Sequence, residues 1–169
     1  RLRSQPRNLL LFLAGMALLG VSGGMMETTF NNYVADVFHL GADARGRLEF
    51  PRELPGFLTA LFAGLLFFLP ESHIAAYSAL AVGAGMLGLA LIGPDWGALL
   101  GVVTLWSIGS HLLMPIRSSL SMALAHGEQR GKRLGEISGA GIAAGIVGCA
   151  FVWVVLRYLR ARYEVIFIA

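Results

Sequence analysis

Charged residues are scarce in this chain, and cysteine is almost absent. Of the 169 residues only 14% are charged, and Cys149 is the single cysteine. Soluble domains are about 25% charged, so the composition excludes an ordinary soluble domain. It also excludes a disordered chain, which needs high charge, and a disulfide scaffold, because Cys149 has no partner within the chain. The remainder is apolar, since 56% of the residues are hydrophobic and the mean hydropathy is +0.70.

Six apolar stretches recur along the chain, separated by connections that contain proline, glycine or charge. A transmembrane helix needs about 20 residues, so we predict an all-α polytopic membrane bundle in a single domain, with five complete transmembrane helices and the start of a sixth. The chain begins at Arg1 and ends inside an apolar run, so we interpret it as a fragment of a longer protein. The expected spans are 9–33, 54–69, 74–92, 97–125, 136–158 and 163–169.

The connection over residues 38–53 is expected to be a polar loop. Pro51 and Pro55 suit the start of a helix better than its interior, so the second span is predicted to begin at the end of this loop. Arg52 and Glu53 would then snorkel at its membrane entrance.

Two features of the N-terminal part leave alternatives open. A signal peptide would explain the first stretch, because small residues follow at 20–23, but the apolar run exceeds the usual core of about 7 to 15 residues. The connections hold six lysines and arginines on each side of the membrane, with Arg117 near one edge. The positive-inside rule therefore does not fix the orientation.

Three spans each carry a stripe of small and polar residues at helical spacing. Small residues four apart allow two helices to approach closely, so Gly20, Gly24, Gly141 and Gly145 are predicted to pack helices together. Ionisable side chains in a span usually face a bundle interior or a watery cavity. The stripes comprise Gly20, Gly24, Glu27 and Asn31 in the first span, Thr104, Ser107, His111, Met114, Ser118 and Ser121 in the fourth, and Ser138, Gly141, Gly145 and Gly148 in the fifth.

Depth along the helices predicts which ionisable side chains can meet. Glu27 is expected near the outer rim, whereas His111 and Arg117 lie deeper on a helix that runs the other way. We expect Arg117 to form a structural ion pair with Glu71 or Glu136 at its own membrane level, with a solvated arginine as the alternative.

Signatures of enzymes and metal sites are weak. Residues 20–23 match the Gly-x-Ser-Gly pattern of rhomboid intramembrane proteases, with His111 as a base for Ser22, but their expected depths keep them apart. The four histidines are scattered, and no phosphate-binding glycine loop occurs. The basic loop at 130–133 suits anionic lipid headgroups and is too short to indicate nucleic acid. We expect no enzyme, metal site, cofactor or nucleic-acid partner.

Motifs in two regions resemble the N-terminal half of a major facilitator superfamily transporter. Within residues 31–48, the segments Asn-Asn-Tyr, Leu-Gly-Ala-Asp and Gly-Arg-Leu are similar to the end of that family's first helix and the loop into its second. Within residues 115–135, a proline followed by Ser-Ser-Leu, Arg-Gly and Leu-Gly resembles the end of the fourth helix and the inner loop into the fifth. The resemblance implies six helices per half, with helices one, two, four and five around a central cavity.

The resemblance also implies a function, namely secondary active transport of a small molecule by alternating access. The partners would be that substrate, a missing C-terminal half of the same chain and membrane lipid. The location would be a bacterial-type plasma membrane, with the N-terminus in the cytoplasm. The expected substrate cavity comprises Thr104, Ser107, His111 and Met114, with Glu27 and Asn31 toward the outer gate.

Two expectations complete the sequence-based interpretation. His111 is a candidate pH sensor, because small shifts move a histidine across the physiological range. The alternative function is a non-transporting membrane scaffold or assembly subunit whose glycine faces bind partner helices. A transporter half would present an open polar face, whereas a scaffold would bury its polar stripes.

Overall fold

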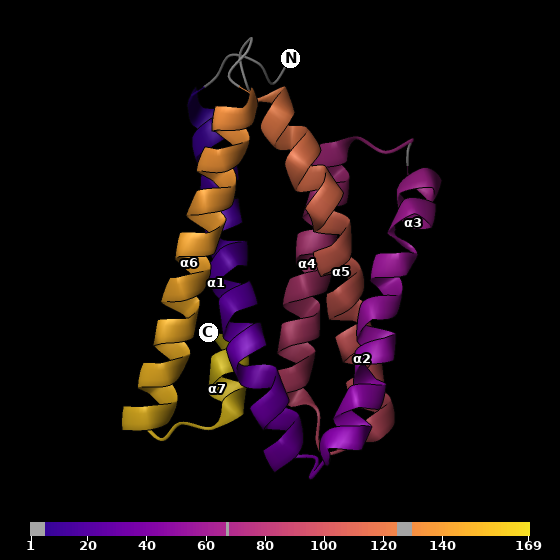
Figure 1. Ribbon diagram of the computed structural model, residues 1–169, viewed down its shortest axis with the longest axis vertical. Helices are drawn as coiled ribbons and strands as arrows, with labels where there is room; N and C mark the ends of the chain where they lie inside the picture. Colours follow the sequence, from indigo (N-terminus) through magenta and orange to yellow (C-terminus); the bar gives the residue numbers. More distant parts are fainter. Residues whose placement is uncertain (1–5, 67, 125–129) are drawn as a thin grey trace.

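The computed structural model describes residues 6–66, 68–124 and 130–169, and all regular structure within them is helical (Figure 1). The predicted all-α class is confirmed for this described part of the chain. The helices are α1 (Pro6–Asp36), α2 (Ala42–Phe57), α3 (Thr59–Leu65), α4 (Glu71–Leu91), α5 (Trp96–Ala123), α6 (Arg130–Tyr158) and α7 (Tyr163–Ile168).

Four of the described helices, α1, α4, α5 and α6, are long and apolar enough to cross a membrane. The chain is therefore a multi-pass helical membrane protein. The predicted count of five complete spans is not confirmed, because the second stretch forms two shorter helices, α2 and α3. The end predicted for the fourth span, at residue 125, lies outside the described residues.

The segment predicted as a polar loop is helical from Ala42 onward. Pro51 and Pro55 lie inside α2 and not at its start, so the prediction for residues 38–53 is wrong. The helix is interrupted only at Leu58, whose N–H donates to Leu54 O at 3.2 Å and whose carbonyl accepts from Phe62 N at 2.9 Å. Helical hydrogen bonds thus cross the interruption, and α3 continues α2.

The long helices form two pairs. Figure 1 shows α1 beside α6, α5 in front of α4, and α2 followed by α3 along the other side of α5. Glycines make both pairs tight. A Cβ atom on Gly85 would lie 2.5 Å from Trp106 Cβ, and one on Gly109 would lie 2.5 Å from Ser78 O.

The main core lies where α1 ends and α2 and α5 begin. It is built around Tyr33, whose hydroxyl donates to Leu89 O of α4 at 2.9 Å. Its ring packs edge-on against Phe38, Tyr163 and Phe167 at centroid distances of 5.5, 5.8 and 5.0 Å. This core joins the two helix pairs at the lower end of the view in Figure 1.

We call the contact between α1 and α6 the glycine seam, defined by Gly20, Gly24, Gly141, Gly145 and Gly148. A Cβ atom on Gly20 would overlap the carbonyl oxygen of Gly141, and one on Gly24 would overlap that of Gly145. The structure thus places the four glycines singled out in the sequence at one backbone-to-backbone contact.

Candidate functional site

A connected group of charged and polar side chains lies between α2 and α5. We call it the charged seam, defined by Glu49, Arg52, Glu53, Ser107 and His111. Arg52 Nη2 lies 2.9 Å from Glu49 Oε2, and Arg52 Nε lies 3.3 Å from Glu53 Oε1. Glu53 Oε2 in turn lies 3.4 Å from His111 Nε2. The seam therefore links two helices through one arginine, two carboxylates and one imidazole.

Helical spacing explains how the seam assembles. Glu49, Arg52 and Glu53 are three and four residues apart and share one face of α2, and Ser107 and His111 are four apart on α5. Gly56 makes room for the imidazole, because a Cβ atom there would lie 2.8 Å from His111 Cδ2 and Nε2. The side chains thus meet because α2 approaches α5 closely at a glycine.

Arg52 also ties the seam to α1. Its guanidinium carbon lies 5.9 Å from the ring centroid of Phe30, a cation–π contact with a fully buried ring. Only 16% of the Arg52 side chain and 14% of the His111 side chain are exposed. The guanidinium and the imidazole are therefore largely withdrawn from solvent.

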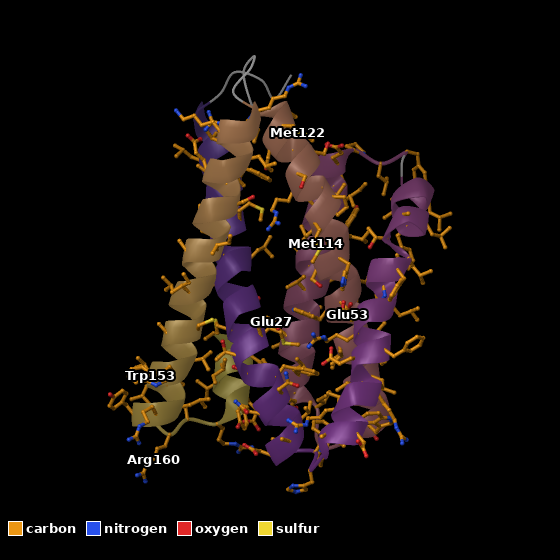
Figure 2. The ribbon with its side chains drawn as sticks, in the orientation of Figure 1. Glu27, Glu53, Met114, Met122, Trp153 and Arg160 are labelled. Carbon is orange, nitrogen blue, oxygen red and sulfur yellow. The ribbon has the colours of Figure 1, made fainter. Side chains whose placement is uncertain are left out.

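The seam lies between the two ends of the bundle (Figure 2), with its carboxylates at the surface between α2 and α5. His111 is near the middle of α5, one of the four apolar helices, and Figure 2 shows Glu53 between the two ends of the bundle. The prediction that Arg52 and Glu53 snorkel at the entrance of a span is therefore wrong. Helix α2 begins twelve residues earlier than expected, which moves both residues from its start into its second half.

Hydrogen-bond directions locate a proton site. His111 Nδ1 lies 3.0 Å from the backbone oxygen of Ser107, which can only accept, so this contact is a hydrogen bond in the tautomer that carries a hydrogen on Nδ1. The Ser107 hydroxyl donates to the backbone oxygen of Arg52, and its own oxygen lies 3.0 Å from Nδ1. Nε2 is left to face Glu53 Oε2. A hydrogen bond between these two atoms requires one proton, held by either group.

Charge arithmetic supports the same conclusion. Two carboxylates, one guanidinium and a neutral imidazole give the seam a formal charge of −1, and one added proton brings it to zero. Both carboxylates reach solvent, since 40% of the Glu49 side chain and 48% of the Glu53 side chain are exposed. The arrangement therefore brings two carboxylates, one guanidinium and one imidazole together between α2 and α5.

A cavity of about 280 Å³ lies on a neighbouring face of α5, toward α1 and α6. Trp106, Ser110, Met114 and Arg117 line it from α5. These residues are three or four apart and share a helix face. The cavity and the charged seam are thus separate sites on one helix.

The structure divides the α5 residues predicted to line a substrate cavity. Ser107 and His111 are joined, but they face α2, and Ser107 is 0% exposed. Met114 lines the cavity and is 55% exposed. Thr104 is half-buried and does not belong to the lining of this cavity.

The two α1 residues predicted at the outer gate, Glu27 and Asn31, are both exposed. Helix α1 continues nine residues beyond Glu27 to Asp36, about 13 Å of rise. The helix thus extends three residues beyond the predicted end at residue 33, and the position of Glu27 near the outer rim of the membrane stays a prediction. Figure 2 shows Glu27 at about the level of Glu53, on a different helix.

The predicted ion pair of Arg117 does not form among the described residues. Glu71 accepts from the hydroxyl of Ser119 at 2.6 Å, and Glu136 pairs with Arg133 at 2.8 Å. Arg117 instead faces the cavity, and its buried Nε has no hydrogen-bond partner in the described part of the chain. The pair with Glu71 does not form because Arg117 lies on a different face of α5 from Ser119, the residue that contacts Glu71 of α4.

Ser22 and His111 are engaged separately. The Ser22 hydroxyl donates to Met86 Sδ at 2.8 Å, whereas His111 contacts Ser107 and Glu53. The structure therefore does not pair them as a nucleophile and its base.

Sequence reasoning missed the contribution of α2 to the site. The signal was present, because Glu49, Arg52 and Glu53 have the spacing of one helix face. The two prolines, which favour the start of a helix over its interior, hide this signal.

Comparison of the chain with protein-family models, with curated proteins and with solved structures finds no match. The functional argument therefore depends on the geometry of the charged seam and the cavity.

Proposed function

We propose that this chain is the N-terminal part of a secondary active transporter of the major facilitator type, which moves a small molecule across a membrane by alternating access. The observation that carries the proposal is the Glu53–His111 contact in the middle of an apolar bundle. Ionisable groups inside a membrane protein are costly and mark substrate or ion pathways. Here they sit between two helices and lack one proton for neutrality.

The seam supplies a means of coupling. When a proton lies between Glu53 and His111, it bonds α2 to α5; when it leaves, a carboxylate faces an imidazole lone pair and the bond is lost. The other charged groups that face this contact are Arg52 and Glu49 of α2. Protonation therefore changes how strongly α2 is held, and the interruption at Leu58 gives that helix a place to bend.

The glycine seam favours transport over the scaffold alternative. A scaffold would use its glycine faces to bind partner helices, but Gly20 and Gly24 are already covered by Gly141 and Gly145 of the same chain. Glu27, Asn31 and Met114 are exposed, as expected of a polar face that a second half of the transporter would cover.

The test measures proton movement. The intact protein is reconstituted into liposomes that contain a pH-sensitive dye, and a panel of amino acids, sugars and organic acids is added outside. We expect at least one compound to drive protons across, and His111→Ala, His111→Gln and Glu53→Gln each to abolish the movement. His73→Gln is the matched control, since this histidine is exposed at the start of α4. Transport with an unchanged pH profile in the His111 variants would refute the proposal.

A further inference from the structure

Two residues that line the cavity between α1, α5 and α6 each carry a buried nitrogen donor without a partner in the described part of the chain. Arg117 Nε and Trp106 Nε1 are both buried without a hydrogen bond in the described part of the chain, and both residues line this cavity. Buried donors in proteins are almost always paired, and an unpaired one carries a large desolvation penalty. Arg117 is the one charged residue in the lining of this cavity, and no carboxylate of the described residues pairs with its guanidinium, so its charge is left for a bound anion to balance.

The surroundings of Arg117 show what kind of molecule this is. The lining of the cavity contains no carboxylate, and its other side chains include Met16, Leu19 and Leu113. The Ser110 hydroxyl is already donated to Ser107 O at 3.0 Å. A guanidinium is always charged and presents a planar fork that fits a carboxylate with two parallel hydrogen bonds. The ligand therefore has an anionic head and an apolar body.

We propose that this cavity binds a small organic carboxylate, with its carboxylate on Arg117 and its apolar body against the methionine and leucine side chains toward Trp106. A volume of about 280 Å³ is just below the usual range for small-molecule sites, about 300 to 1,000 Å³, so the ligand is small.

The position of the cavity relates the ligand to the charged seam. Trp106 and Ser110 line the cavity, while Ser107 and His111 belong to the seam on the adjacent face of α5. A movement of α5 that follows protonation of the seam would therefore displace the residues of α5 that line the cavity. Only the step from ligand to transported substrate rests on the proposed function; binding itself does not.

Three probes of one shape and different charge test the inference. Benzoate, benzamide and benzamidinium are anionic, neutral and cationic, and their binding to the intact protein in phosphatidylcholine nanodiscs is measured by equilibrium dialysis. We expect benzoate to bind at least about tenfold more tightly than either analogue, as a charge-assisted pair to arginine implies. Arg117→Gln should remove this preference, and Arg117→Lys should retain only part of it. Arg157→Gln, an exposed arginine near the end of α6, should leave it unchanged.

The outcomes separate this inference from the proposed function. Equal binding of the three probes, or benzoate binding that survives Arg117→Gln, would overturn the inference while leaving proton movement through the seam intact. Benzoate binding in a protein that moves no protons with any compound would support the inference and refute the transporter. Thermal unfolding checks that each variant is folded. If Arg117→Gln does not fold, the partial loss of the benzoate preference expected for Arg117→Lys tests the inference in its place.

A lipid headgroup is the other source of an anion at this position. Nanodiscs that contain phosphatidylglycerol distinguish the two. Benzoate affinity that stays the same in both lipids supports a soluble carboxylate. Loss of benzoate binding in phosphatidylglycerol would assign the cavity to anionic lipid and overturn the proposal.

Discussion

The glycine seam and the charged seam join helices in opposite ways. In the glycine seam, Gly20 and Gly24 bring the backbone of α1 directly against the backbone of α6 at Gly141 and Gly145. In the charged seam, α2 and α5 meet through long ionisable side chains. Under the proposed function the charged seam takes up and releases a proton while the glycine seam stays the same, so the difference predicts which seam holds the bundle and which can move.

The physical reason lies in the membrane as a solvent. Lipid gives apolar helices little reason to associate, so close packing of small residues supplies much of the attraction. That attraction needs an exact fit and does not depend on pH. An ion pair away from water depends strongly on whether each member is charged, and so it responds to protonation.

The largest expected effect is on the glycine seam. We expect Gly24→Ala to destabilise the bundle by about 3 kcal/mol, the upper part of the usual cost of overpacking, because the new methyl group would overlap the backbone of Gly145, which cannot rotate away. Thermal unfolding in detergent measures the loss. Gly139→Ala is the control, since nothing lies within 4 Å of a Cβ atom there, and it should be neutral or slightly stabilising. Equal unfolding temperatures of the two variants would show that the seam does not hold the bundle.

A smaller loss is expected in the charged seam when its arginine is removed. Arg52→Gln leaves Glu49 and Glu53 without their cation, and we expect about 2 kcal/mol of destabilisation, below the usual cost of breaking a fully buried pair because both carboxylates are partly exposed. The double variant Arg52→Gln/Glu49→Gln removes one of the two repelling charges and should recover part of the loss. No recovery would mean that Arg52 acts by packing on Phe30 and not by charge.

The sequence predicted the two central helices better than the others. Expected spans 74–92 and 97–125 match α4 and α5 closely, because apolar runs there are bounded by clear signals. One such signal is Asp95, whose carboxylate accepts from Ala98 N at 2.6 Å and caps the start of α5. Apolar length and a helix cap are local properties, and they can be seen in a single sequence.

Helix α2 could not be predicted from the same signals. Its prolines favour a helix start, and its charges favour a loop, yet packing on α5 keeps residues 42–57 helical. Likewise, helical spacing predicts which residues share a face of α5. It does not predict that Ser107 faces α2 or that Arg117 lines a cavity. Faces follow from the sequence, whereas the neighbour on each face follows from tertiary packing.

A further prediction concerns the hydroxyl within the charged seam. Ser107→Ala removes the donor to the backbone oxygen of Arg52 and a contact of His111, and we expect a loss of about 1 kcal/mol, the usual net value of one hydrogen bond. Ser110→Ala is matched to it, because this hydroxyl bonds only within α5, and it should cost less. If both variants unfold at the same temperature, the link between the helices contributes nothing.

The smallest effect on stability is expected for Gly56→Ala in the charged seam, the same substitution as Gly24→Ala in the glycine seam. This variant should nevertheless have a clear effect on function. A methyl group on Gly56 would press on the His111 ring at 2.8 Å, but a side chain can rotate where a backbone cannot. We therefore expect Gly56→Ala to cost less than about 1 kcal/mol. The imidazole would turn away from Glu53, so the pH dependence of proton movement in liposomes should shift or disappear. If Gly56→Ala is as unstable as Gly24→Ala, both seams are rigid. If the pH dependence of proton movement is unchanged in Gly56→Ala, the proton does not bind at the Glu53–His111 contact.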